Sequence, residues 1–144
     1  MRNHIGPAGA YVCAGLLHLV LCGCVEKLDS SEQDAVRDAI EVIAGQGFDW
    51  EATQLKKALD SGRIRKDENL IEDDGRCAQN ELHDNQNPCA SIVVVATDYL
   101  SAPPDFLAAV LVHEISHCVY PVTDAGHCLV YWREYKFGRS LAHP

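Results

Sequence analysis

The sequence predicts a single α+β domain, in which a short sheet is combined with a buried central helix and flanking helices. Three segments have the patterns of helices, and residues 91–97 (SIVVVAT) form an apolar, β-branched run that is typical of a strand. The chain has 144 residues, which suits one compact domain. Hydrophobic residues make up 47% of it and charged residues 23%, so extensive disorder is excluded.

Two helices are expected in the first half of the chain. The first begins near Ser30, because Ser30 and Gln33 have the spacing of a capping box. An apolar stripe at helical spacing follows, and glycines at 45 and 47 end the helix. A second helix is expected from Trp50 to about Leu59. Both helices are interpreted as scaffold.

The second half of the chain supplies the centre of the expected fold. Residues 63–90 are polar and are expected to form a solvated loop with a short strand at Arg63–Lys66. The apolar run 91–97 shows no alternation, so both faces of that strand should be covered. Pro104 suits the first turn of a helix that runs to about Val119. The first half of this helix is apolar on every side, which predicts that it is buried.

Residues 1–24 have the order of a secretory signal, with a charge at Arg2, an apolar run and then small residues. The run is too short to span a bilayer as a permanent helix, so no transmembrane domain is expected in the mature chain. The sequence Leu21-Cys22-Gly23-Cys24 resembles the lipobox of bacterial lipoproteins. This resemblance implies cleavage before Cys24 and a lipid on its thiol, and secretion without a lipid is the alternative.

This interpretation divides the chain into a signal peptide at 1–23, a tether at 24–29 and one domain at 30–144. The protein is expected in the bacterial cell envelope, on the periplasmic or extracellular face, with membrane contact only through the lipid on Cys24. The chain has 21 acidic against 12 basic residues and a formal net charge of −9. Such a surface disfavours binding to the phosphate backbone of nucleic acids.

Four cysteines remain besides Cys24 once the signal is removed: Cys77, Cys89, Cys118 and Cys128. An even number suits two disulfides in an oxidising compartment. The favoured arrangement joins neighbours in the sequence, Cys77 with Cys89 and Cys118 with Cys128. The two other connectivities stay open.

The segment His113-Glu114-Ile115-Ser116-His117 carries the H-E-x-x-H pattern on the expected buried helix. A helix has about 3.6 residues per turn, so both imidazoles lie on one face and can bind one ion from the same side. Neutral imidazole is a good ligand for zinc. Glu114 is expected to act as general base, taking a proton from a water that zinc activates and passing it to the leaving amine.

On these residues the chain resembles the zincin metallopeptidases, over about residues 91–136. The resemblance implies a small zincin-like domain with an α+β fold that hydrolyses peptides or proteins with Zn²⁺ as cofactor. It also implies that strand 91–97 runs along the cleft and pairs with extended substrate. One alternative is an envelope lipoprotein that binds zinc or a partner without turnover. Another is a metal-free binding module whose histidines belong to the core.

A catalytic zinc needs a third protein ligand, for which Asp124, His127 and Glu134 are the candidates. His127 is preferred, because residues 126–132 (GHCLVYW) resemble the third-ligand segment of SprT-like small zincins. In that segment an aromatic residue follows the histidine four positions later, and Tyr131 has this place.

The local pattern adds a geometric expectation. A helix capped at residue 123 or 124 would hold His127 in its first turn, with Tyr131 and Glu134 on the same face. Glu134 could then support His127 by a hydrogen bond. Tyr120 and Tyr131 are expected to pack in the core, and donation of a hydrogen bond to an oxyanion is the alternative.

Overall fold

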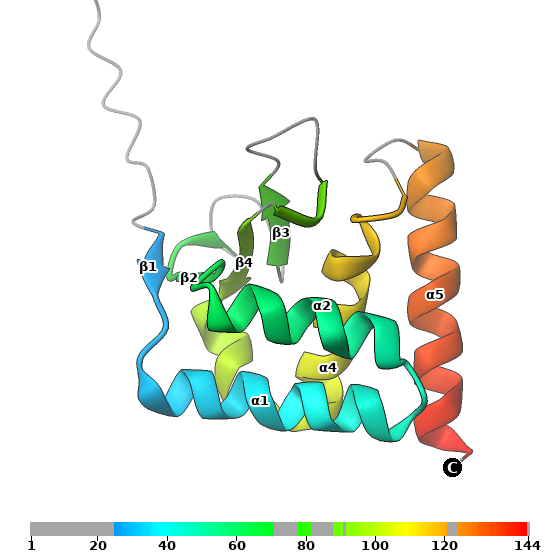
Figure 1. Ribbon diagram of the computed structural model, residues 1–144, viewed down its shortest axis with the longest axis horizontal. Coiled ribbons are helices and arrows are strands. Elements are labelled where there is room, and N and C mark those ends of the chain that lie inside the picture. Colours follow the sequence, from blue (N-terminus) through cyan, green and yellow to red (C-terminus); the bar gives the residue numbers. More distant parts are fainter. Residues whose placement is uncertain (1–24, 71–77, 82–87, 91, 121–123, 144) are drawn as a thin grey trace, which may run out of the picture.

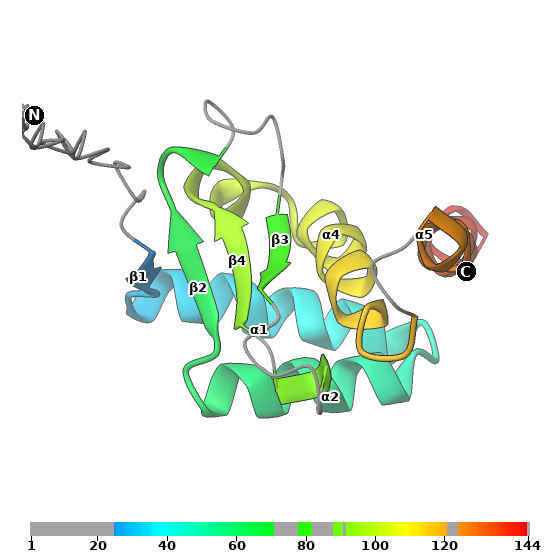
Figure 2. The ribbon, with the colours of Figure 1, turned by 90° about the horizontal axis from the view of Figure 1, so that it is seen from above.

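The computed structural model describes residues 25–70, 78–81, 88–90, 92–120 and 124–143 (Figure 1). It confirms the α+β class, with helices packed beside a four-stranded mixed sheet (Figure 2). The predicted signal peptide and Cys24 lie outside these residues. Within them, no helix is long and apolar enough to cross a membrane.

Two antiparallel helices form one layer of the fold, α1 (Ser30–Gly45) and α2 (Asp49–Asp60) (Figure 1). The N-cap of α1 is Asp29 and not the predicted Ser30. The Asp29 carboxylate accepts a hydrogen bond from the Glu32 backbone at 2.9 Å, and the Glu32 carboxylate accepts one from the Asp29 backbone at 2.7 Å. The capping box is therefore shifted by one residue, because Asp29 and Glu32 have the same spacing as Ser30 and Gln33 and both are good capping residues.

The sheet has the order β1-β2-β4-β3. Its strands are β1 (Glu26–Lys27), β2 (Ile64–Asp67), β4 (Ile92–Ala96) and β3 (Ala78–Glu81). β2 and β4 are parallel, and the two outer pairs are antiparallel. The expected tether is thus part of the sheet, since it contains β1. β3 lies in the segment that the sequence predicts to be a loop. The strand was not predicted because its residues, AQNE, have little intrinsic preference for a strand.

Strand β4 is buried on both faces, as predicted. Val93 and Val95 belong to the main core, whereas Val94 and Ala96 pack with Leu70 on the opposite face. Because β4 lies between β2 and β3, both of its edges are already paired. The expectation that this strand pairs with substrate is therefore wrong, and the outer strand beside it is β3.

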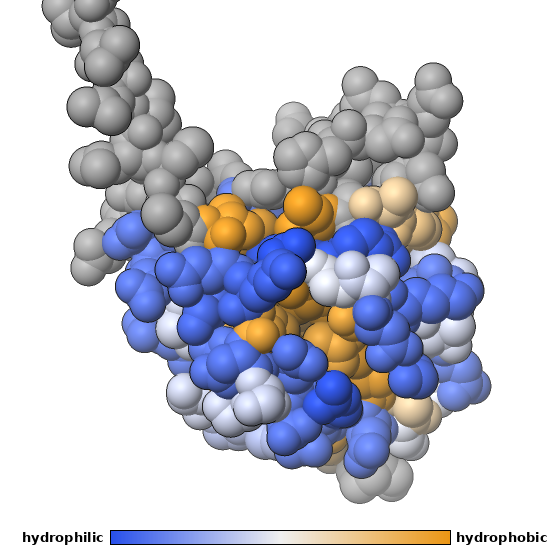
Figure 3. Space-filling view, turned by 60° about the vertical axis from the view of Figure 1, so that its left-hand side comes forward, coloured by the Kyte–Doolittle hydropathy of each residue, from blue (hydrophilic) through white to orange (hydrophobic). Residues whose placement is uncertain are grey.

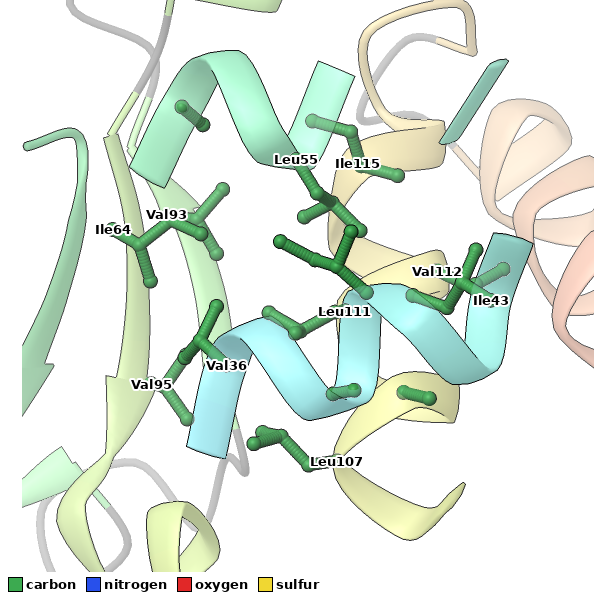
Figure 4. Close-up of a cluster of buried hydrophobic side chains, with 14 of the residues drawn as sticks. Val36, Ile43, Leu55, Ile64, Val93, Val95, Leu107, Leu111, Val112 and Ile115 are labelled. Atoms are coloured by element: carbon green, nitrogen blue, oxygen red, sulfur yellow. The ribbon is translucent and has the colours of Figure 1, made fainter. Parts of the chain in front are cut away.

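The core between the sheet and helices centres on α4 (Pro104–Ser116), which contacts α1, α2 and β3. Figure 4 shows its apolar side chains meeting those of α1, α2 and the sheet. The labelled residues are Val36, Ile43, Leu55, Ile64, Val93, Val95, Leu107, Leu111, Val112 and Ile115. Figure 3 shows a mostly polar outer face with apolar side chains visible in the recesses, as expected for helices with one face in the core.

The last helix, α5 (Asp124–Ala142), packs along α4 at the end of the molecule opposite β1 (Figures 1 and 2). Phe137 is fully buried and meets Phe48 edge-to-face, with ring centroids 5.2 Å apart. Arg133 forms an ion pair with Glu51 of α2, and its guanidinium lies 4.4 Å from the centre of the Phe48 ring. These contacts fix α5 against the rest of the domain.

Replacing Arg133 with alanine should lower the free energy of unfolding by about 3 kcal/mol, because the Glu51 carboxylate would stay buried without its cation. The Glu51 side chain is only 3% exposed. Denaturation by urea at pH 7 measures the loss. The matched control is Lys56→Ala, which breaks the exposed pair Lys56–Asp60 and should cost less than about 0.5 kcal/mol. Equal losses in the two variants would contradict this role for Arg133.

Candidate metal centre

Helix α4 presents two imidazoles on one face. His113 lies in its last turn and His117 is its C-cap residue, and their ring centroids are 5.4 Å apart. The helix ends at Ser116, before the predicted Val119. A tight turn follows, in which the backbone N–H groups of Cys118 and Val119 donate to carbonyls three residues earlier. The sequence therefore predicted the arrangement of the two histidines correctly, although the helix is shorter than expected.

Helix α5 brings a third imidazole to the same place. His127 lies in the first turn of α5, as predicted, and its ring centroid is 4.8 Å from that of His117 and 6.3 Å from that of His113. One nitrogen from each ring lies within 4.8 Å of the others. Among the residues that the structure describes, no other group of three or more His, Cys, Asp and Glu side chains meets this condition. The three histidines could hold a metal ion.

The residues fit a metal ion in spacing and in chemistry. Tetrahedral bonds of about 2.1 Å place two ligand nitrogens about 3.4 Å apart. The observed separations of up to 4.8 Å are slightly wider, so small rotations of the side chains would close the group on an ion. Three imidazoles suit zinc, and they also suit copper, iron and nickel.

Hydrogen bonds orient the rings of His113 and His117. The Nδ1 atom of His113 lies 2.9 Å from the Glu134 carboxylate of α5, and Nδ1 of His117 lies 3.3 Å from the carbonyl oxygen of Tyr120. When each Nδ1–H donates to these oxygens, Nε2 of each ring is left to bind a metal ion. Such outer partners are a common property of metal sites.

These contacts correct one prediction about Glu134. The sequence predicts Glu134 as a candidate third ligand or as a partner of His127, whereas in the structure its carboxylate is hydrogen-bonded to His113. Asp124, the other candidate ligand, begins α5, but its side chain lies outside the described part of the structure. No local signal in the sequence joins His113 to a residue 21 positions later, because the contact depends on how α5 crosses α4.

The local charges act differently on the two histidines of α4. Burial lowers the pKa of His113, but the hydrogen bond to Glu134 and the charges of Glu114 and Glu134 together raise that pKa above its ordinary value. Burial lowers the pKa of His117, and the hydrogen bond to Tyr120 offsets this only in part. The surroundings of His117 therefore favour its neutral form, which is the form that binds metal, whereas the carboxylates near His113 favour a positive charge on that ring.

Glu114 lies directly after the first histidine and is 7% exposed. Its negative charge acts on the His113 ring. A carboxylate in a buried helix is costly unless a cation or hydrogen-bond donors offset its charge. A metal ion bound beside His113 would add a favourable charge next to this carboxylate.

Tyr131 and Tyr120 do not have the core positions expected for them. Tyr131 is 59% exposed, with its ring centroid 5.1 Å from that of His113 and 6.1 Å from that of His127. Tyr120 is partly buried, and its backbone carbonyl accepts the His117 hydrogen bond. Tyr131 therefore borders His113 and His127, since it lies one helical turn after His127.

The described cysteines do not follow the favoured pairing. Cys89, Cys118 and Cys128 are free, and Cys77 lies outside the described residues. The side chain of Cys118 is hydrogen-bonded to Cys89, and burial raises the pKa of the Cys118 thiol. The predicted bond between Cys118 and Cys128 is therefore not present. The residue after His117 contacts the segment before β4, and not α5 as the sequence spacing suggested.

Comparisons with known proteins assign no family to this chain. No family model matches it, and searches of curated proteins and of solved structures find no similar protein. Conclusions about function therefore rest on the chemistry of the site itself.

Replacing Glu134 with glutamine should weaken zinc binding by about tenfold to a hundredfold, because the charged acceptor that orients His113 would be lost. Competition with a zinc-binding dye at pH 7.5 measures the affinity. The control is Glu41→Gln on the exposed face of α1, which makes the same chemical change away from the site. If both variants bound zinc as tightly as the unmodified protein, Glu134 would have no role at the centre.

Proposed function

We propose that this protein is a zinc-dependent metallopeptidase that hydrolyses peptide bonds. One observation carries the proposal: His113, His117 and His127 converge, and the same buried helix carries Glu114 beside them. Three protein ligands leave one position of a tetrahedral zinc open, which distinguishes a catalytic site from a closed structural one. Bound there, zinc would polarise the substrate carbonyl and lower the pKa of a water.

Glu114 would be the general base of this reaction. It follows His113 directly on α4 and is largely shielded from solvent. In this position it would take a proton from the attacking water as the water adds to the carbonyl carbon. It would then give this proton to the nitrogen of the leaving amine, so that one group serves both proton transfers.

Tyr131 would stabilise the oxyanion of the tetrahedral intermediate. It borders His113 and His127, and its exposure leaves the phenol accessible to a substrate. A phenol donates a hydrogen bond readily, and donors aimed at an oxyanion have large effects on rate.

An extended peptide is the substrate that the fold would accept best. β3 is the last strand of the sheet on the side where α4 lies, and α4 and β3 are in contact (Figure 2). A peptide added alongside β3 would gain main-chain hydrogen bonds with little dependence on its sequence. The strand would then guide the peptide past the face of α4 that carries the histidines.

Export to the cell envelope belongs to the same proposal and rests on the sequence. Residues 1–24 have the order of a signal, and Cys24 ends a lipobox-like segment. In this location the enzyme would meet peptides and unfolded proteins outside the cytoplasm.

Replacing Glu114 with glutamine should lower kcat for hydrolysis of fluorescein-labelled, unfolded casein by about 10²–10⁴-fold, because the amide cannot accept the proton of the attacking water. Zinc content, measured by atomic emission, should stay at one ion per chain. Removal of zinc by a chelator should abolish the activity of the unmodified protein, and added zinc should restore it.

The same comparison separates the proposal from a zinc protein without turnover. If Glu114→Gln and the unmodified protein both held one zinc and neither cleaved casein or a mixed peptide library, the site would be non-catalytic. If neither bound zinc after zinc was offered and the excess removed, the histidines would be core residues. Both outcomes contradict the peptidase.

Replacing Tyr131 with phenylalanine should lower kcat by about 10²-fold with little change in KM, because only the transition state would lose a hydrogen bond. Zinc affinity should not change. Tyr135→Phe is the matched control, since Tyr135 is similarly exposed one turn later on α5. Equal activity of the two variants would remove Tyr131 from the mechanism.

A further inference from the structure

A pair of thiols lies beside the metal centre, outside the three histidines. Cys89 belongs to η1 (Pro88–Ala90), just before the central strand, and Cys118 follows the ligand His117. The two are 29 positions apart in the sequence. Their side chains are nevertheless hydrogen-bonded to each other, so the sulfur atoms are neighbours.

The framework of the fold holds both cysteines in place. The Arg63 guanidinium donates a hydrogen bond to the carbonyl oxygen of Cys89, and the Arg63 carbonyl accepts one from the Val93 backbone at 2.9 Å. The backbone N–H of Cys118 donates to the carbonyl of Ile115 at 3.0 Å, in the turn after α4. Both cysteines are also partly buried. The contact between the thiols is therefore part of the folded domain and not a chance meeting of surface side chains.

We propose that Cys89 and Cys118 form a disulfide when the protein is in an oxidising compartment. A disulfide joins two sulfur atoms about 2.05 Å apart, and rotation about the Cα–Cβ bonds moves the sulfur atoms of hydrogen-bonded thiols toward this distance. Cys128, by contrast, is exposed on α5. The bond would join η1, and through it the sheet, to the end of the helix that carries the metal ligands.

The bond would form by exchange with an external disulfide, such as oxidised glutathione. One cysteine thiolate attacks a sulfur of glutathione disulfide, which gives a mixed disulfide and releases one glutathione thiolate. The second cysteine then attacks the mixed disulfide and releases the other glutathione. Two cysteine thiols are oxidised and one external disulfide is reduced, and the two cysteine protons end on the two glutathione thiols.

The position of the bond gives it a consequence for the metal. Cys118 follows His117 directly and lies two residues before Tyr120, whose carbonyl orients the His117 ring. A disulfide at Cys118 would restrain the backbone of His117 and also the Tyr120 carbonyl that is hydrogen-bonded to the His117 ring. The oxidised protein should therefore hold its metal more firmly than the reduced protein. This consequence rests on the metal site of the proposed function, whereas formation of the disulfide does not.

Peptide mapping of the full chain tests the pairing. Trypsin is unsuitable, because the sequence has no lysine or arginine between Arg76 and Arg133, so all four cysteines would stay in one peptide. A protease that cleaves before aspartate separates them, since Asp84, Asp105 and Asp124 lie between successive cysteines. The protein is incubated with oxidised glutathione, its remaining thiols are blocked, and it is cleaved without reduction.

The expected product is residues 84–97 joined to residues 105–123, which separates into two peptides on reduction. Cys89 or Cys118 joined to any other cysteine would overturn the proposal. It would equally be overturned if both remained as free, blocked thiols after oxidation.

Thermal unfolding gives a second readout. The oxidised protein should melt about 10 °C above the reduced protein, because the bond closes a loop of about 30 residues. Zinc transfer to a chelator should be about tenfold slower from the oxidised protein. Both differences should persist in Cys128→Ser and disappear in Cys89→Ser and Cys118→Ser. Differences that survived in either of these last two variants would assign the bond to another pair.

Discussion

The packing of α5 along α4 is the contact on which the candidate metal centre depends. α4 offers two imidazoles, and in the described part of the chain only α5 adds a third. The same helix supplies the carboxylate of Glu134 that orients His113. α5 is held elsewhere, by Phe137 in the core and by Arg133 against α2. Apolar and ionic contacts away from the histidines therefore set the arrangement of the three imidazoles.

Helix α4 both forms the apolar core and carries buried polar side chains. Its apolar residues form the middle of the core, yet it also buries Glu114, Ser116 and His117. Buried polar groups are tolerated when they are hydrogen-bonded. Ser116 donates to the Val112 carbonyl at 2.6 Å, and His117 is bonded to the Tyr120 carbonyl. Glu114 directly follows His113, so the buried polar residues of α4 gather at the end of the helix that carries the histidines.

The parts that could be predicted from the sequence are those that short-range patterns determine. Both faces of β4 are covered because its residues are apolar without alternation, and His113 and His117 share a face because of helical geometry. The parts that could not be predicted depend on tertiary contacts. β3 has a polar sequence and exists because β4 offers it a partner, and the partners of Glu134 and Cys118 come from segments distant in the chain. Spacing along the sequence favoured partners close in the chain, namely His127 for Glu134 and Cys128 for Cys118.

The first strand bears on how the protein would stand at a membrane. β1 begins at Glu26, two residues after the cysteine proposed to carry a lipid, and two residues span at most about 7 Å. The linker between the lipid and β1 would therefore be very short, so the β1 edge of the sheet would lie close to the bilayer surface. β1 and α5 lie at opposite ends of the domain (Figures 1 and 2). The end of the domain at which α5 packs on α4 would then lie away from the lipid, on the side where polypeptides arrive from solution.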